Sequence, residues 1–447
     1  MIKIYDTMTR SLRDFVPLTE NVVNMYVCGP TVYNYIHIGN ARSAVAFDTI
    51  RRYFEYCGYT VNYISNFTDV DDKIIKAANE AGISTKELSD KFIAAFMEDT
   101  GQLGIKPATQ NPRVINYMDE IIAFVSTLVD KGFAYVSEGD VYFRVAKSNN
   151  YAKLANKTLE DLEIGASGRT DAETERKENP LDFALWKAAK EGEVSWDSPW
   201  GPGRPGWHIE CSVMATEILG DTIDIHGGGA DLEFPHHTNE IAQSEAKTGK
   251  TFANYWMHNG FVNVDNEKMS KSLGNFVTVH DMLQTVDGQV LRFFLATQQY
   301  RKPINFTEKA IHDAEVNLKY LKNTHSLPLT EQVNQAELQT YLDTFQEAMD
   351  DDFNTANGVT VLFDMAKWIN SGNYDETVKN AFEKILQVFG IVFEEEVLDE
   401  DIEKLIEERQ AARANKDFAT ADRIRDELAA QGIKLLDTKE GVRWTRD

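Results

Sequence analysis

Apolar and polar positions near the start of the chain change from the repeat of a strand to that of a helix and back. Residues 25–27 end a short apolar strand, and a Gly-Pro turn follows at residues 29–30. Residues 41–56 have apolar side chains at helical spacing, Gly58 suits the end of a helix, and residues 59–64 alternate like a second strand. This order of strand, helix and strand predicts a βαβ unit, a parallel sheet and an α/β fold.

The pattern then divides the rest of the chain into regions. A mixed, hydrophilic stretch ends in a loop rich in glycine and proline after Trp200. The helical repeat is almost continuous from Thr307, and a short strand is predicted near residues 432–436. The predicted domains are residues 1–107 and 201–265 as two halves of one sheet domain, 108–200 as a connective insertion, 266–306 as a loop-rich connection, 307–393 as a helical domain and 394–447 as a small α+β extension.

Composition and charge narrow the class of protein. The chain has 447 residues, enough for roughly three domains. No apolar run approaches the ~18 residues of a membrane span, and the N-terminus lacks a signal-peptide pattern, so we expect a cytoplasmic protein. The three cysteines are too sparse for a disulfide framework. The net charge of −25 argues against nucleic-acid binding, but residues 409–446 hold nine basic and six acidic side chains, a local charge of +3.

The first candidate for chemistry is the sequence His37-Ile38-Gly39-Asn40, where a loop meets the predicted helix. The N-terminus of a helix has unpaired N–H groups that attract phosphate, and Gly39 permits a nucleotide to approach the backbone. His37 can donate a hydrogen bond to a phosphate oxygen. On its own, however, such a sequence is more often only a turn.

The second candidate is Lys268-Met269-Ser270-Lys271-Ser272, followed by Leu273-Gly274-Asn275. Its two lysines are three residues apart, and the hydroxyls and the glycine make the segment polar and mobile. We interpret it as a loop that closes over a triphosphate and neutralises departing pyrophosphate. The alternative is a solvated basic turn.

Together these two segments resemble the paired signatures of class I aminoacyl-tRNA synthetases, His-Ile-Gly-His and Lys-Met-Ser-Lys-Ser. Their order and separation also agree with that family. The chain departs from the pattern at Asn40, where the family has its second histidine. The asparagine amide can still donate a hydrogen bond to phosphate, but it cannot carry a positive charge.

Four further residues form a candidate metal site: Cys28, Cys211, His236 and Glu240. His236 and Glu240 are four residues apart, so a helix would place both on one face. Two thiolates, an imidazole and a carboxylate are a plausible tetrahedral zinc set. The spacing alone is weak evidence, because no Cys-x-x-Cys is present and buried cysteines are common. His237 is the nearest competitor for the imidazole position.

The segments around these residues resemble the cysteinyl-tRNA synthetases over essentially the whole chain. The resemblance is carried by residues 26–33 (YVCGPTVY), 66–73 (NFTDVDDK), 206–212 (GWHIECS), 224–229 (DIHGGG), 234–240 (FPHHTNE), 351–355 (DDFNT) and 421–426 (ADRIRD). It implies a Rossmann-like catalytic domain with an insertion, then a helical anticodon-binding domain. It implies zinc ligands at Cys28, Cys211, His236 and Glu240, ATP contacts at Thr31, His37, Gly39, Asn40, Gly227, Gly228, Gly229, Lys268 and Lys271, of which His37, Lys268 and Lys271 are catalytic, and cysteine contacts at Gly29, Thr68, Trp207 and His226.

The activity implied by the resemblance is activation of L-cysteine with ATP and its transfer to the 3′ end of tRNA-Cys. One zinc ion per chain would select the cysteine thiolate over the hydroxyl of serine, magnesium would accompany ATP, and the chain would act as a monomer. The helical region and the basic C-terminal stretch would hold the anticodon end of the tRNA. Two alternatives remain open from the sequence: a ligase that passes cysteine to an amino-sugar acceptor, and a catalytically inactive tRNA-binding paralogue.

Overall fold

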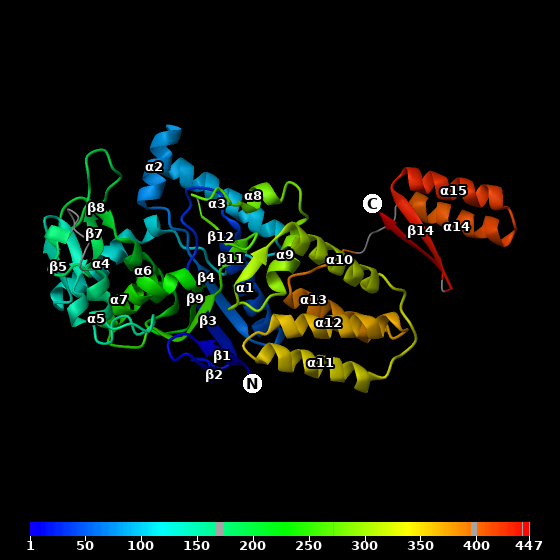
Figure 1. The fold of residues 1–447 in the computed structure, drawn as a ribbon, viewed down its shortest axis with the longest axis horizontal. Helices are drawn as coiled ribbons and strands as arrows, with labels where there is room; N and C mark the ends of the chain where they lie inside the picture. The colour runs from blue at the N-terminus through cyan, green and yellow to red at the C-terminus, as the bar shows by residue number, and fades with distance from the viewer. Residues whose placement is uncertain (167–173, 271, 395–399, 440, 447) are drawn as a thin grey trace. The chain divides into compact units, whose positions relative to one another are not determined.

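The computed structural model describes residues 1–166, 174–270, 272–394, 400–439 and 441–446. Lys271, the second lysine of the predicted phosphate loop, therefore lies outside the described residues. The chain forms two compact units, Met1–Val392 and Phe393–Asp447 (Figure 1). Each unit is described by itself below.

The core of the larger unit is a parallel sheet. Its first strand β3 (Val22–Val27) is followed by helix α1 (Ile38–Tyr56) and strand β4 (Thr60–Ser65), which confirms the predicted βαβ unit. Strands β9 (Ile223–Gly229) and β10 (Ala253–Asn259) complete the order β10-β9-β3-β4, with all neighbours parallel. Strands from both ends of the predicted insertion therefore share one sheet.

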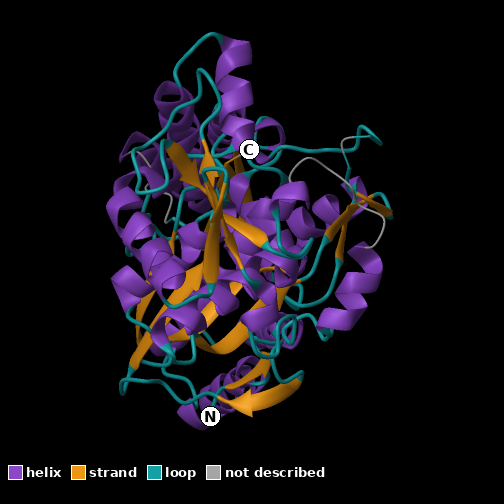
Figure 2. Cartoon of the chain, turned by 90° about the vertical axis from the view of Figure 1, so that its left-hand side faces the viewer, coloured by secondary structure: helices purple, strands orange, loops and turns teal. Residues whose placement is uncertain are grey.

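Helices cover both faces of this sheet, and helices surround the strands in Figure 2. A Cβ at Gly227 of β9 would meet the ring of Phe47 in α1, so this residue faces α1. The preceding residue, His226, instead bonds Glu240 of helix α7 (Thr238–Thr248). Because successive strand residues face opposite sides, α1 and α7 lie on opposite faces. Helix α6 (Trp207–Leu219) packs against α7.

The inserted region has a sheet of its own, which the hydrophilic pattern did not predict. Its strands are antiparallel in the order β5-β6-β7-β8, and helix α4 (Met118–Asp130) packs on β5. The strands are β5 (Ala134–Ser137), β6 (Asp140–Phe143), β7 (Phe183–Ala188) and β8 (Gly203–Pro205), and the further helices before β7 are α2 (Asp72–Ala81), α3 (Thr85–Gln102) and α5 (Leu159–Ala166).

The region after the sheet is helical, as predicted. Helix α10 (Glu308–His325) begins where Thr307 accepts a hydrogen bond from the Ala310 amide, and this confirms the predicted helix start. The helices that follow are α11 (Gln335–Asp350), α12 (Thr355–Asn370) and α13 (Glu376–Val388). The connection before α10 contains β11 (Val262–Val264), β12 (Glu267–Lys268), α8 (Val279–Met282), α9 (Gly288–Ala296) and β13 (Ile304–Phe306). A separate hairpin of β1 (Lys3–Asp6) and β2 (Ser11–Asp14) lies before the parallel sheet in the sequence.

The smaller unit is α+β, as predicted. Two helices, α14 (Glu400–Ala414) and α15 (Phe418–Ala430), precede a hairpin of β14 (Ile433–Thr438) and β15 (Gly441–Arg446). Trp444 packs against the apolar cluster between these elements. Because Trp444 packs in this way, its ring offers little free surface on which an unpaired nucleic-acid base could stack.

Candidate metal centre and nucleotide cavity

The predicted site residues gather where the parallel strands end. Cys28 directly follows β3, Gly229 ends β9, and Thr68 comes shortly after β4. In open parallel sheets ligands bind at the carboxyl ends of the strands. A topology of βαβ units thus brings residues from distant parts of the chain to one edge.

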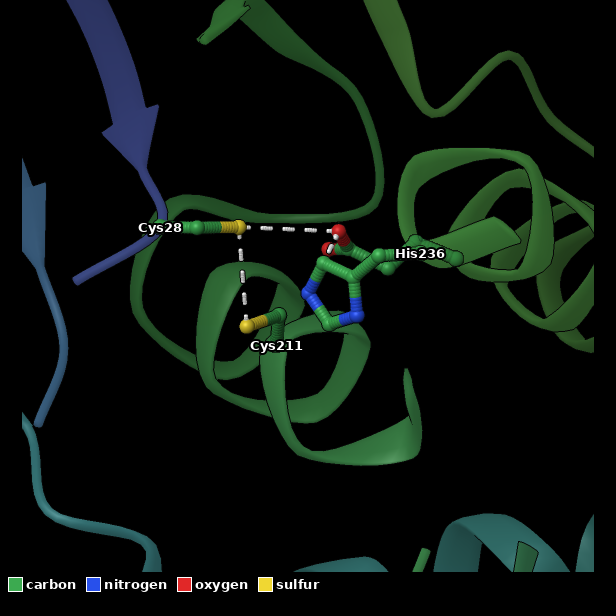
Figure 3. Close-up of side chains that lie close together, drawn as sticks. Cys28, Cys211 and His236 are labelled. Carbon is green, nitrogen blue, oxygen red and sulfur yellow. Dashed lines mark hydrogen bonds and ion pairs between the residues drawn. The ribbon is translucent and has the colours of Figure 1, made fainter. Parts of the chain in front are cut away.

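Cys28, Cys211, His236 and Glu240 form one cluster, and one ligand atom from each lies within 4.8 Å of the others. The Cys28 Sγ atom lies 3.7 Å from Cys211 Sγ and 3.7 Å from a Glu240 carboxylate oxygen (Figure 3). His236 Nε2 lies 3.3 Å from the same carboxylate. Ligands held at zinc bond lengths in a tetrahedron are about 3.3 to 3.8 Å apart, so these separations suit one central ion.

Each of two ligands is oriented by a neighbouring histidine. His226 Nε2 bonds the other oxygen of Glu240 at 2.9 Å, and His208 Nδ1 bonds His236 Nδ1 at 2.9 Å. His236 Nε2 is buried and has no hydrogen-bond partner, because its approach to Glu240 lacks hydrogen-bond geometry. A nitrogen oriented through its other ring atom and left without a partner fits a metal ligand.

A second set in the same place consists of Cys28, His226, His237 and Glu240. His237 Nε2 lies 3.4 Å from Cys28 Sγ, so the predicted competitor does reach the cluster. In this set, however, His226 and Glu240 are already hydrogen-bonded to each other, and His237 Nδ1 bonds His258. We favour the set with His236, because it uses the unpartnered nitrogen and leaves His226 to orient Glu240.

The electrostatics of the cluster favour a cation. Burial raises the pKa of the Cys28 thiol well above its usual range, and the nearby Cys211 and Glu240 raise it further. Burial also raises the pKa of the Glu240 carboxyl. Burial and the neighbouring imidazoles of His208 and His226 lower the pKa of His236, so its ring is neutral and able to bind a metal. A cation between these groups would stabilise the charged thiolates and carboxylate that burial disfavours.

Beside the cluster lies a cavity of about 660 Å³ that contains many of the predicted contacts. The predicted residues that line it are Cys28, Gly29, Thr31, His37, Gly39, Asn40, Trp207, Gly229 and Lys268. Gly227, Gly228, Thr68 and His226 do not line it. A larger open groove of about 1070 Å³, between α1, α11 and α13, contains none of the predicted residues.

The sequence around Gly39 forms the capped start of α1. The Asn40 amide donates to His37 Nδ1, and the His37 amide donates to Asn40 Oδ1, both at 3.2 Å. Because Nδ1 accepts, a neutral His37 ring carries its proton on Nε2, the atom that can donate to a phosphate. The side-chain oxygen of Asn40 takes part in this cap, while its side-chain NH₂ group can still donate hydrogen bonds. The asparagine thus has a structural reason to stand where the second histidine is expected.

The loop at residues 268–275, the second motif, is held in part by its own polar groups. Lys268 lies on the short strand β12, opposite Asn263 of β11, and its ammonium lies 5.7 Å from the ring centre of Phe261. The side chain of Asn275 accepts from the Ser270 amide and donates to the Lys268 carbonyl. This places Lys268 at the wall of the cavity while its side chain stays exposed.

The predicted cysteine contacts either line the cavity, as Gly29 and Trp207 do, or support its wall, as Thr68 does. A Cβ at Gly29 would overlap the Asn66 carbonyl oxygen, so only glycine fits the turn after Cys28. The Thr68 amide bonds the Pro30 carbonyl, and Asn66 bonds both Gly29 and Thr68. Trp207, at the start of α6, stacks on His236 with ring centres 4.1 Å apart.

Sequence reasoning missed the further histidines of the site. His208 and His258 were not assigned a role, yet His208 bonds His236, and His258 links His237 to Thr7. Five of the nine histidines of the chain gather here: His208, His226, His236, His237 and His258. Their density between residues 208 and 258 was the available signal.

Family models match most of the chain. Residues 14–316 match "tRNA synthetases class I (C) catalytic domain", residues 344–394 match "DALR domain", and residues 395–444 match "Cysteinyl-tRNA ligase anticodon binding domain". The fold is similar to that of a methionyl-tRNA synthetase from Mycobacterium tuberculosis, with a TM-score of 0.60 and 15% identity over 82% of this chain and 89% of that one. A leucyl-tRNA synthetase complex from Agrobacterium radiobacter K84 gives a TM-score of 0.59 and 10% identity, covering 84% of each chain. Fold and signatures together define a class I aminoacyl-tRNA synthetase.

Relatives that match over the full length of both chains show which family within this class the chain belongs to. The chain is 95% identical over its full length, and over that of the relative, to the Cysteine–tRNA ligase of Streptococcus thermophilus strain CNRZ 1066. It is 84% identical, again over both full lengths, to that of Streptococcus pyogenes serotype M6. The chain belongs to the cysteine–tRNA ligase family, and its activity is that of a cysteine–tRNA ligase. This decides against the amino-sugar ligase and the inactive paralogue. Within the described part of the chain, no helix has both the length and the apolar character needed to cross a membrane.

Proposed function

We propose that one zinc ion per chain, held by Cys28, Cys211, His236 and Glu240, selects cysteine for activation. The observation that supports this most directly is the convergence of four suitable ligand atoms, one of them a buried nitrogen without a partner, beside the cavity. Zinc would bind the sulfur of the substrate as a thiolate, which the harder and less acidic hydroxyl of serine matches poorly. Selectivity would then need no separate editing domain.

The remaining predicted contacts of the substrate cysteine would surround or support its pocket. Trp207 lines the cavity and stacks on His236, so it would close the space around a small amino acid. Gly29 lies in the cavity wall, where its backbone can approach the substrate. We assign Thr68 and His226 to the support of this pocket: Thr68 holds the turn through Pro30, and His226 orients Glu240.

ATP would bind with its phosphates at the N-terminus of α1. His37 Nε2 and the Asn40 amide group would donate to phosphate oxygens, and the dipole of α1 would add to this attraction. Thr31, Gly39 and Gly229 line the same cavity, and Gly229 would let adenosine lie against the end of β9, with Gly227 and Gly228 behind it in the strand. A magnesium ion would accompany the triphosphate as part of the substrate.

Catalysis of adenylate formation then depends on alignment and charge. The carboxylate of cysteine attacks the α-phosphorus in line, a bond to that phosphorus forms, and pyrophosphate leaves with the electrons of the broken P–O bond. Lys268 and Lys271 would neutralise the departing pyrophosphate, and His37 would stabilise charge on the phosphate oxygens. In the second step a ribose hydroxyl of the tRNA attacks the adenylate carbonyl and releases AMP.

The tRNA would extend from the cavity to the helical region and the C-terminal unit. We propose the domain boundaries given from the sequence, with residues 266–306 near the acceptor stem and residues 307–447 toward the anticodon end. We propose that the protein acts as a monomer, with all four candidate ligands supplied by the one chain. We place the reaction in the cytoplasm, where tRNA is charged.

The test is ATP–pyrophosphate exchange with each amino acid, followed by charging of purified tRNA-Cys. Cysteine should support exchange, and serine should fall below it by about 10⁴-fold in kcat/KM. A chelator should remove both zinc and activity, and zinc should restore them. Equal exchange with serine, or full activity in zinc-free protein, would refute the proposed selection by zinc.

A further inference from the structure

The turn between α11 and α12 contains the DDFNT sequence, residues 351–355, to which neither the metal centre nor the cavity gives a role. Asp352 and Phe353 have φ angles of +54° and +53°, a left-handed conformation that residues with side chains rarely adopt. Such a conformation persists where the surroundings hold it, and it is frequent at functional positions. Both side chains are buried.

Asp352 collects hydrogen bonds from two segments outside the turn. Its Oδ1 accepts from the Tyr5 amide at 2.9 Å and from the Tyr300 hydroxyl at 2.6 Å. Its Oδ2 accepts from Arg301 Nε at 2.7 Å and from Gln299 Nε2 at 3.3 Å. The backbone of the turn also pairs with β1, through the bridge between Lys3 and Asp351, so the N-terminal hairpin lies beside the helical region (Figure 1).

The segment that Asp352 binds is also fixed to α1. Arg42, two residues after Asn40, is buried, and its guanidinium donates to the carbonyl oxygens of Leu295, Gln299 and Lys302. Residues 295–302 therefore contact Arg42 of α1 on one side and the carboxylate of Asp352, in the turn before α12, on the other.

A second contact runs directly from the turn to α1. Phe353 packs on Phe54 and Tyr53, with ring centres 5.3 and 5.9 Å apart. Thr355, the first residue of α12, donates its hydroxyl to the Gln298 carbonyl at 2.8 Å. This turn therefore helps to orient α12 relative to α1, together with the contacts that α1 makes with α11 and α13.

We propose that Asp352 is a positioning residue for the transfer step: it fixes the helical region against α1, so that a tRNA held by that region presents its 3′ end to the cavity. The inference rests on the proposed contact between residues 307–447 and the tRNA. Adenylate formation uses only groups at the cavity, so it should not depend on Asp352. A substrate too short to reach the helical region should not depend on it either.

The experiment compares two tRNA substrates in the full-length protein. Asp352→Asn should leave cysteine-dependent pyrophosphate exchange within about 2-fold, and lower kcat/KM for full-length tRNA-Cys by about 10- to 100-fold, the usual range of coupling between sites. Charging of a minihelix with the acceptor arm alone should change by less than about 2-fold. The matched control is Asp351→Asn, which removes the same charge from the exposed neighbouring residue and should behave as wild type.

A milder variant guards against misfolding. Tyr300→Phe keeps the buried ring and removes one hydrogen bond to Asp352, so it should give a smaller loss of the same selectivity for the full-length tRNA. Equal losses with both tRNA substrates, or a loss of exchange, would show that Asp352 only stabilises the fold and would overturn the proposal. No loss in either variant would overturn it as well. If the wild-type protein charges the minihelix as efficiently as the tRNA, the proposed tRNA contact itself fails, and the inference fails with it.

Discussion

Burial disfavours the charged forms of two candidate ligands, Cys28 and Glu240, unless a cation lies beside them. Burial, with the nearby Cys211 and Glu240, raises the pKa of the Cys28 thiol, and burial also raises the pKa of the Glu240 carboxyl, so the thiol must release a proton when metal binds. His208 and His226 orient two of the four ligands, His236 and Glu240. The residue types are visible in the sequence, but their supporting partners are set only by the fold.

Removal of one ligand should therefore remove the metal. Cys211→Ala leaves three ligands, and we expect bound zinc to fall from about one per chain to a small fraction of that, because one of the two thiolates that hold the ion is lost. Elemental analysis of the purified protein measures this. Cys57→Ala, which removes the cysteine outside the cluster, is the matched control and should keep its zinc. Full zinc content in the Cys211 variant would exclude this ligand set.

Buried histidines should also make the fold sensitive to acid. Burial, with a smaller effect from His226, lowers the pKa of His258 to about 3. Its unfolded value is about 6.5, so below pH 6.5 the unfolded chain binds a proton that the folded chain does not. Stability is thus complete above about pH 6.5 and falls by up to about 1.4 kcal/mol per pH unit as the pH drops toward 3.

The thermal unfolding midpoint between pH 7.5 and 5.5 measures this loss. His258→Gln should unfold at a lower midpoint at pH 7.5 but lose less on acidification, because the titrating group is gone. His312→Gln, on the exposed surface of α10, should show the same acid loss as the wild type. An unchanged acid loss in the His258 variant would contradict the assignment.

At the scale of elements, α1 connects the cavity with the segment of residues 295–302. Its N-terminus meets the cavity through the reciprocal cap of His37 and Asn40, and Arg42 holds the segment after α9. Local pattern was sufficient to predict this helix and its flanking strands, because hydrophobic period and turn residues lie close in sequence. The sheet of β5 to β8 escaped prediction, because its strands are short and its pairing joins residues as far apart as Tyr142 and Ala184.

The same limit applies to the site. Cys28, His37 and Lys268 could be proposed from motifs, whereas the choice between His236 and His237, and the partners of Asp352, depend on contacts between distant segments. A sequence pattern gives the type of each side chain and its local spacing. It does not give the direction in which a buried carboxylate or imidazole finds its partner.

Two substitutions at Asn40 should separate the cap of α1 from phosphate binding. Asn40→Ala removes both functions, so it should lower the free energy of unfolding by about 0.5–2 kcal/mol and slow pyrophosphate exchange. Asn40→Asp keeps an acceptor for the His37 amide but places a negative charge near phosphate. It should retain near wild-type stability and lose more exchange activity than the alanine variant. If both variants exchange as the wild type does, Asn40 has only a structural role.

At the scale of the whole molecule, the C-terminal unit is where the charge argument is weakest. The basic side chains of residues 409–446 are partly engaged within the unit, because Arg409 and Arg413 both pair with Asp437, and Arg423 pairs with Glu427. Cations that remain on the exposed surface include Lys416 and Lys439. Phosphate contact would rest on such residues rather than on the arginines, and the tRNA must also approach a chain of net charge −25.

Deletion of residues 393–447 should therefore separate the two half-reactions. The residues removed form a compact unit of their own, and the metal cluster and the cavity lie entirely before residue 280. Cysteine-dependent pyrophosphate exchange should stay near the wild-type level, while kcat/KM for tRNA charging should fall by about 10-fold or more, because a second tRNA contact is lost. In the full chain, the KM for tRNA should rise steeply with salt while exchange changes little. The double variant Lys416→Gln and Lys439→Gln should weaken tRNA binding and flatten that salt dependence without affecting exchange. If the truncated protein charges tRNA as well as the full chain, recognition rests on residues 307–392, and the basic stretch of residues 409–446 has no part in it.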